Sequence, residues 1–356
     1  MSLNINPLID LAINQNASDI HLQTGHKPIL RINGRLLLVE DAEPFQLSEN
    51  TAEFQALLNE KQHAYFEEHG NVDFAFSHNA EVRMRANLFR RQDGLSISLR
   101  IVRNKILNFE QLGLPDFFKE IAENYRQGFF LIVGPTGQGK TTSLASVINY
   151  INNHRSEHIV TIEDPIEYVL YNNKSVIEQR EIGTHASTFE NSLRAAMRQD
   201  PDIIIIGEMR DQETMQAAIT LAETGHLVLS TMHTNSSVQT IDRIIDAFPE
   251  AKQKQIRIQL ASTLSGVVSQ RLIPGVNGEL VFAYERMFMT DAIRNIIRTE
   301  KIEQIYNALQ GEDADGYVRL EQCLLNLVKE GKITKEDALN YATNRDLVEV
   351  FEQYQK

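Results

Sequence analysis

Two patterns of hydrophobic and polar residues divide the chain near residue 105. In the first part, apolar and polar residues alternate, as in VRMRANLF (82–89) and GLSISLRIV (94–102). This period of two predicts half-buried β-strands. Asn33-Gly34, between PILRI and RLLLV, predicts a tight hairpin turn because both residues tolerate positive φ. With a helical stretch over roughly 48–68, residues 1–104 are predicted to form a small α+β domain with an antiparallel sheet.

The pattern changes after a polar connector over 105–115. The next strand-like segments are continuously apolar: FFLIVG, HIVTIEDP, DIIIIGEMR and HLVLSTMH. Continuous apolar strands separated by helical stretches are typical of a parallel sheet covered by helices on both faces. We therefore predict an α/β domain over 116–356. From about residue 241, apolar residues recur at helical spacing, as in RNIIRTEKIEQIYNAL, which predicts a helical C-terminal subdomain.

Composition and charge narrow the class of protein. The 356 residues are 42% hydrophobic, with 35 Lys and Arg against 48 Asp and Glu, a net charge of −13. The negative electrostatic field of such a charge repels polyanions, so general nucleic-acid binding is disfavoured. Cys323 is the single cysteine, which excludes an intramolecular disulfide and a four-cysteine zinc site. No signal peptide or apolar run long enough to span a membrane is visible. We expect a cytoplasmic protein that reaches the membrane only through a partner.

One segment carries a specific chemical signal. GPTGQGKT fits the phosphate-loop pattern G-x-x-x-x-G-K-[ST], and it follows the apolar strand FFLIV and opens a helix. In such a loop, backbone N–H groups and the helix N-terminus surround phosphates. We therefore predict an ATP site in which Lys140 reaches the β and γ phosphates and the Thr141 hydroxyl ligates Mg²⁺. The predicted nucleotide-binding residues here are Gly134, Pro135, Thr136, Gly137, Gln138, Gly139, Lys140, Thr141 and Thr142.

Acidic residues follow two of the apolar strands. Glu163 closes HIVTIEDP and Glu208 closes DIIIIGEMRD, and the ends of parallel strands present such groups at one edge of a sheet. We expect Glu208 to hold Mg²⁺ through its hydration shell and Glu163 to act as the base that polarises the attacking water. The two roles could be exchanged. Asp211 is instead expected to cap the helix that follows it.

Two histidines bracket HLVLSTMH. His233, at the C-terminal end of that strand, is expected near the γ-phosphate, where it would sense the nucleotide. His226, at the start of the strand, is a second candidate nucleotide contact, although a structural histidine fits its position equally well.

Four arginines are candidates for contacting phosphate from elsewhere in the protein. Arg85 and Arg100 lie on the polar side of the N-terminal sheet, while Arg194 and Arg198 are one helical turn apart. Guanidinium groups bind phosphate in bidentate fashion, and an arginine from another domain or subunit can stabilise phosphoryl transfer. Without further information, a solvated surface position is the better explanation for all four.

These motifs together resemble the secretion-ATPase superfamily, which drives type II secretion and type IV pili. The resemblance rests on GPTGQGKTT, HIVTIEDPIEYV, IIIIGEMRD and AETGHLVLSTMHTN in the family's order, and on Ser18-Asp19-Ile20-His21-Leu22. It covers roughly residues 18–345. DAIRNIIRTEKIEQIYNALQ resembles the AIRNLIRE segment of the PilT-like retraction ATPases. Thr299 departs from the final glutamate of that segment, and Gln138 departs from a commoner serine.

The resemblance implies an ATP-hydrolysing motor for type IV pilus retraction and twitching motility. It implies a RecA-like core, a PAS-like N-terminal domain and a homohexameric ring that acts on an inner-membrane platform protein. It places Arg85 and Arg100 where the N-terminal domain reaches nucleotide, and Arg194 and Arg198 at the subunit interface. The AIRNLIRE-like segment would serve retraction rather than hydrolysis, although an ordinary packed helix explains its apolar stripe. An accessory paralogue that regulates another retraction ATPase stays open, as does, less strongly, a nucleic-acid motor.

Overall fold

A computed structural model describes residues 5–32, 34–79, 81–103, 105–305 and 316–343. The chain divides into two compact units: Met1–Lys105 with Pro165–Val169, and Ile106–Asp164 with Leu170–Lys356. The end of the predicted helical run RNIIRTEKIEQIYNAL and the last residues of the predicted C-terminal subdomain lie outside the described residues.

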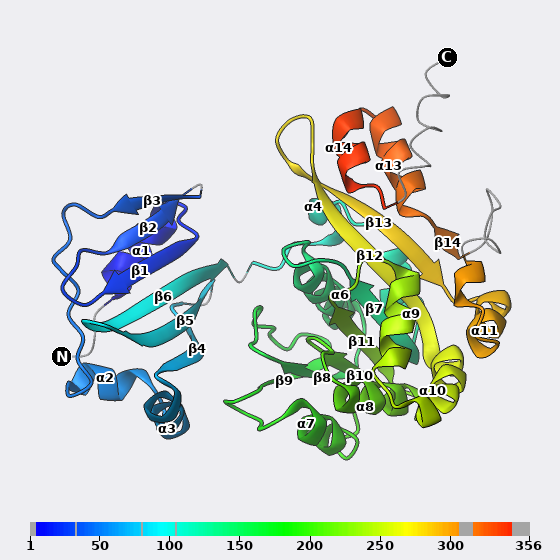
Figure 1. The fold of residues 1–356 in the computed structure, drawn as a ribbon, viewed down its shortest axis with the longest axis horizontal. Helices are drawn as coiled ribbons and strands as arrows, with labels where there is room; N and C mark the ends of the chain where they lie inside the picture. Colours follow the sequence, from blue (N-terminus) through cyan, green and yellow to red (C-terminus); the bar gives the residue numbers. More distant parts are fainter. Residues whose placement is uncertain (1–4, 33, 80, 104, 306–315, 344–356) are drawn as a thin grey trace. The chain divides into compact units, whose positions relative to one another are not determined.

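The first unit is an antiparallel sheet with helices (Figure 1). Its strands, in spatial order, are β3 (Arg35–Leu38), β2 (Ile29–Ile32), β1 (Asp19–Gln23), β6 (Gly94–Arg103), β5 (Val82–Arg91) and β4 (Asn71–Ser77). Its helices are α1 (Asn6–Asn14), α2 (Ala52–Leu57) and α3 (Glu60–His69). The alternation predicted for 82–89 is confirmed, because Val82, Met84, Ala86 and Leu88 are buried while the residues that alternate with them are partly exposed. The helical stretch expected over 48–68 is two helices, since Asn59 forms a capping box that starts α3.

The second unit contains a sheet of eight strands. In spatial order they are β14 (Tyr317–Val318), β13 (Leu280–Phe288), β12 (Leu264–Pro274), β7 (Gly128–Val133), β11 (Leu227–Met232), β10 (Ile203–Ile206), β8 (His158–Glu163) and β9 (Val176–Glu181). Strands β12 to β9 in this order are mutually parallel, and β13 and β14 are antiparallel to their neighbours. The carboxyl ends of β7, β11, β10 and β8 therefore meet at one edge, where an α/β protein binds ligands.

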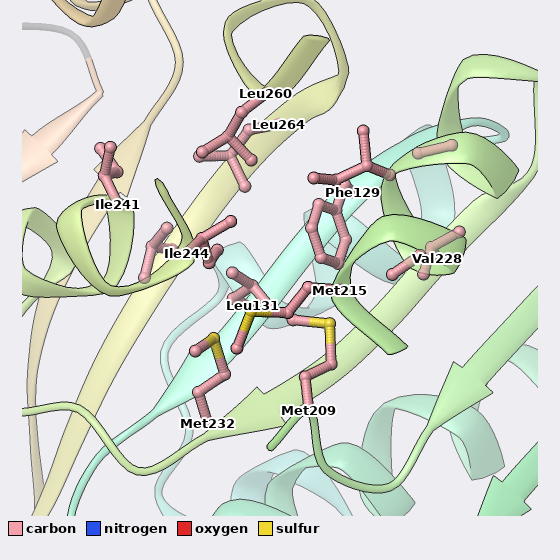
Figure 2. Close-up of a cluster of buried hydrophobic side chains, with 14 of the residues drawn as sticks. Phe129, Leu131, Met209, Met215, Val228, Met232, Ile241, Ile244, Leu260 and Leu264 are labelled. Carbon is pink, nitrogen blue, oxygen red and sulfur yellow. The ribbon is translucent and has the colours of Figure 1, made fainter. Parts of the chain in front are cut away.

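Helices cover both faces of this sheet. One face carries α4 (Phe109–Leu112), α5 (Phe117–Asn124) and α6 (Lys140–His154). The other carries α7 (Phe189–Ala196), α8 (Gln212–Glu223), α9 (Ser237–Asp246), α10 (Glu250–Thr263) and α11 (Asp291–Arg298), followed by the short helix η1 (Ile302–Gln304). Figure 2 shows Phe129 and Leu131 of β7 packed with Met215 of α8 and Ile244 of α9. A smaller cluster joins β12 and β13 to α13 (Leu320–Lys329) and α14 (Lys335–Tyr341).

The helical C-terminal subdomain expected from about residue 241 is only partly correct. The chain does form α9, α10 and α11, but β12 and β13 lie between them and extend the sheet as a long hairpin (Figure 1). Polar residues inside β12 concealed this strand: Ser269, Gln270 and Arg271 interrupt its apolar run, yet all three are buried. Each of the three donates a side-chain hydrogen bond to a backbone carbonyl oxygen distant in sequence, at Asn235 or Gln138, and the hydrophobic pattern does not contain these contacts.

Candidate nucleotide site

The glycine-rich loop connects the end of β7 to the start of α6. Gly137 and Gly139 have φ of 78° and 76°, the left-handed region that favours glycine. Helix α6 begins at Lys140, so its first N–H groups and the positive end of its dipole belong to the loop. The sequence FFLIV-GPTGQGKTT therefore forms the strand–loop–helix unit that phosphate binding requires.

Lys140 lies at the centre of this loop. Its side chain is buried, and Nζ donates hydrogen bonds of 2.9 Å to the carbonyl oxygens of Gly134 and Pro135. Nζ also lies 3.3 Å from Nδ1 of His233. The ammonium is thus held inside the loop by oxygen and nitrogen acceptors, at the position from which it can meet a phosphate.

His233 joins the loop to Glu208. Its Nδ1 lies near Lys140, and its Nε2 is 3.1 Å from Oε1 of Glu208, which is 19% exposed. Because an ammonium only donates and a carboxylate only accepts, these partners assign the neutral tautomer with the proton on Nε2. The His233 side chain is 41% exposed, so it faces the solvent edge of the site. The predicted position of His233 beside the phosphate loop agrees with this geometry, while its sensing role stays a prediction.

Glu208 is fixed from a second side by Arg210. The guanidinium donates to Oε2 of Glu208 from Nε at 2.8 Å, and this hydrogen bond raises the pKa of Arg210 above its usual value. Thr231 at the end of β11 donates to the carbonyl oxygen of Gly207, at 2.6 Å, and so ties the end of β10 to its neighbour. The carboxylate is consequently oriented by cationic and imidazole groups before any ligand binds.

Glu163 ends β8 at the same edge of the sheet. Its Oε1 accepts from the Thr161 hydroxyl at 2.6 Å and from the Gln179 amide at 3.1 Å. A Cβ on Gly207 would lie 3.3 Å from Cα of Glu163, so the glycine lets the ends of β8 and β10 approach closely. The structure thus presents both predicted acids at one edge, and whether Glu163 or Glu208 acts as the base stays a prediction.

His226 lies away from the loop. It precedes β11, and its Nδ1 is 2.9 Å from the carbonyl oxygen of Leu221. The six residues of β11 separate it from the loop edge by about 20 Å at ~3.3 Å per residue. The structure does not bring His226 to the phosphate loop of the same chain, and its hydrogen bond fits the structural reading of this histidine.

Two of the four candidate arginines, Arg194 and Arg198, lie on or just after α7 of the second unit, outside the loop cluster, and the other two belong to the first unit. Arg194, on α7, is 70% exposed and pairs with Glu190 at 2.6 Å, and Arg198 is exposed just beyond the helix. Arg85 and Arg100 are directly opposite each other on β5 and β6 of the first unit.

Each of the two arginines on the first sheet has an acidic partner in its own unit. Arg85 bonds Glu167 at 3.0 Å, and Arg100 bonds Asp19 at 2.9 Å. The nucleotide roles of all four arginines stay predictions.

Sequence reasoning missed the part of β12 beside the loop. Arg271 is buried and donates to the carbonyl oxygens of Asn235, at 2.8 Å, and Gln270, at 3.0 Å. Burial lowers the pKa of Arg271. Asn235 follows His233 in the same loop, so β12 supports the histidine segment as well as the phosphate loop. The only signal in the sequence was the polar Ser-Gln-Arg run inside an apolar strand.

Fold and site together define a P-loop ATPase. The chain belongs to the family described as type II/IV secretion system protein, whose model matches residues 2–304. The prediction of an α/β P-loop ATPase with a mainly parallel sheet is confirmed, while the PAS-like description of the first unit stays a prediction. Within the described residues, no helix is long and apolar enough to cross a membrane.

The most informative relatives are pilus ATPases. The chain is 41% identical to the type IV pilus retraction ATPase PilT of Pseudomonas aeruginosa, over 94% of this chain and 97% of that protein. It is 34% identical to the type IV pilus ATPase PilU of the same organism, over 94% and 87% respectively. A crystal structure of the retraction motor PilT with bound ADP matches with a TM-score of 0.89 and 42% identity, covering 98% of this chain and all 100% of that one.

Proposed function

We propose that this protein is an ATP-hydrolysing motor that powers retraction of a type IV pilus and thereby twitching motility. The observation that carries the proposal is the connection from Lys140 through His233 to Glu208, at 3.3 and 3.1 Å. It joins the phosphate-binding element to the acid that follows a parallel strand, as phosphoryl transfer requires. The extensive similarity to a retraction ATPase and to an ADP-bound structure of a pilus retraction motor supports the same function.

The chain's own groups have distinct roles in this proposal. Lys140 and the loop N–H groups bind the β and γ phosphates, and His233 responds to the γ-phosphate. Glu163 polarises the attacking water and Glu208 orients the metal, or these two exchange roles. Arg85 and Arg100 of the N-terminal domain, residues 1–104, approach the phosphates when that domain closes. Loss of the γ-phosphate removes the contacts that hold the closed arrangement.

The oxygen groups at the loop fit Mg²⁺. The Thr141 hydroxyl and the Glu208 carboxylate are hard donors of the kind that magnesium prefers. Because His233 and Arg210 already bond both carboxylate oxygens, Glu208 would act through metal-bound water. The ion would neutralise phosphate charge during transfer.

The motor is proposed to work as a homohexameric ring at the inner face of the cytoplasmic membrane. Arg194 and Arg198, both exposed, would then face the neighbouring subunit. An inner-membrane platform protein would receive the mechanical work, and nucleic acid would have no part. DNA that stimulates ATP turnover several-fold at physiological salt would contradict this exclusion.

Departures from the motor pattern favour a second candidate function. Gln138 and Thr299 differ from the residues expected there, and the similarity to PilU spans most of the chain. In this alternative the protein is an accessory paralogue that binds and regulates another retraction ATPase. Robust ATP turnover by the isolated protein, together with loss of retraction in a strain lacking only this gene, would contradict it.

ATP turnover of the purified full-length protein tests the catalytic assignment. We expect Lys140→Ala and Glu208→Ala each to lower kcat by about 100-fold or more, because each removes a group that stabilises phosphoryl transfer. Lys119→Ala is the matched control, since this lysine is 53% exposed on α5. Undiminished rates in either site variant would end the assignment.

The phenotype of a deletion strain tests the direction of the motor. Persistent, excess surface filaments without twitching are expected for a lost retraction motor. Cells without filaments would instead indicate assembly.

A further inference from the structure

Strand β12 extends past the end of its neighbour β7. The two strands are paired as far as Ser269 and Val133, after which β7 gives way to the phosphate loop. Gln270 and Leu272 consequently lie beside that loop. A Cβ on Gly134 would be 2.6 Å from the carbonyl oxygen of Gln270, and one on Gly139 would be 3.2 Å from Leu272. Both ends of the loop are therefore in close contact with β12.

Two side-chain amides connect the loop to this strand. Oε1 of Gln138, inside the loop, accepts a hydrogen bond of 2.7 Å from the backbone N–H of Leu272. In return, Nε2 of Gln270 donates to the backbone carbonyl oxygen of Gln138. A backbone N–H can only donate and a backbone carbonyl oxygen can only accept. These two partners therefore determine which end of each side-chain amide is oxygen and which is nitrogen. These two hydrogen bonds take the place of the backbone hydrogen bonds that paired β12 with β7 before β7 ended.

The amide pair is well placed to keep the loop in its bound shape. Gln270 is 0% exposed, so solvent does not compete for its hydrogen bond with Gln138. The contact reaches the loop between Gly137 and Gly139, whose left-handed backbone makes this stretch costly to order without support. Because the contact already orders the loop in the free protein, the loop loses less conformational entropy when phosphates bind.

We propose that Gln270 and the Gln138 side chain are positioning residues that preorganise the phosphate loop for nucleotide. The inference rests on the proposed ATPase function and adds to it a pair of residues that contact no phosphate through their side chains. Preorganisation stabilises the ground-state complex and the transition state equally. Its loss therefore raises KM and the nucleotide Kd while leaving kcat nearly unchanged.

The test compares Gln138→Met and Gln270→Glu with the wild type, in the full-length protein. Methionine keeps the length of the Gln138 side chain without its acceptor, and glutamate turns the donor of Gln270 into an acceptor that faces another oxygen. Gln253→Met is the matched control, because the amide of Gln253, in α10, donates to the backbone carbonyl oxygen of Phe248, which precedes the helix, at 3.1 Å. Its loss removes a similar bond at a distance from the loop.

We expect each loop variant to raise the Kd of ATP, measured by equilibrium titration, and its KM by about tenfold, the size expected for one lost buried hydrogen bond. Their kcat should stay within about twofold of wild type. Gln253→Met should change the thermal midpoint alone. Wild-type Kd and KM in both loop variants, or the same rise in Gln253→Met, would overturn the inference. If the wild type binds ATP without hydrolysing it, the proposed function fails, while the Kd comparison still decides this inference.

Discussion

The two arginines of α11 should differ in what they do, although both belong to the segment that resembles AIRNLIRE. Arg294 donates from Nη1 to the carbonyl oxygens of Ala261 and Ser262. These carbonyls lie in the last turn of α10, where no intrahelical partner is available. Burial, and secondarily the charge of Arg298, lowers the pKa of Arg294. Arg298 itself is exposed.

The structure gives a magnitude for losing each side chain. A hydrogen bond from a charged donor contributes about 1.5–3 kcal/mol, and a cation at a helix C-terminus contributes about 0.3–1 kcal/mol. Since Arg294 is only partly buried, we expect Arg294→Ala to reduce the free energy of unfolding by about 2 kcal/mol, towards the low end of these contributions. Exposed residues such as Arg298 typically contribute within about 0.5 kcal/mol.

Differential scanning calorimetry of the two variants measures this contrast. At about 2–4 °C per kcal/mol for a domain of this size, Arg294→Ala should lower the thermal midpoint by about 4–8 °C. Arg298→Ala should lower it by at most about 2 °C. Arg294→Lys should recover part of the loss, because its ammonium can still donate to a terminal carbonyl. Equal midpoints for the two alanine variants would refute the assignment of Arg294 to helix capping.

The same variants separate folding from mechanical work. Arg298→Ala should keep wild-type ATP turnover, and in a complemented deletion strain it should lose twitching if this exposed arginine contacts the machinery that retraction drives. Twitching at the wild-type level would show instead that the segment acts as an ordinary packed helix.

Two further predictions concern the Arg90–Glu49 ion pair and the two histidines on either side of β11. Hydrogen bonds from Arg90 lower the pKa of Glu49, so this ion pair stabilises the first unit above the ordinary glutamate pKa, and the contribution is lost as pH falls through the lowered value. Glu49→Gln should therefore reduce the free energy of unfolding by less than about 1 kcal/mol at pH 7. Urea titrations should show this difference disappearing in acid, and a difference that grows in acid would contradict the sign. His233→Ala should reduce ATP turnover, while His226→Ala should leave the Kd and KM of ATP unchanged. A higher Kd of ATP for His226→Ala in nucleotide titrations would support the predicted role of His226 as a nucleotide contact.

Local patterns were sufficient for the general architecture. The alternation around Met84 and the continuous apolar run of Ile203–Ile206 reflect burial on one face and on two faces of a sheet. The phosphate loop was equally predictable, because its glycines, Lys140 and the following helix are contiguous in the chain. Each of these features depends on neighbours in sequence, and that is why the sequence alone could determine them.

Tertiary structure decided what depends on distant parts of the chain. His233 and Lys140 meet only because β7 and β11 are adjacent and parallel, and the same pairing direction leaves His226 at the other end of its strand. The sequence did not predict the buried Gln270 for a similar reason. Burying a polar side chain in a strand is costly without a hydrogen-bond partner, and the acceptor for the Gln270 amide, the carbonyl oxygen of Gln138, is distant in sequence. A sequence displays the residues of a site, but the sheet order and direction determine which of them meet.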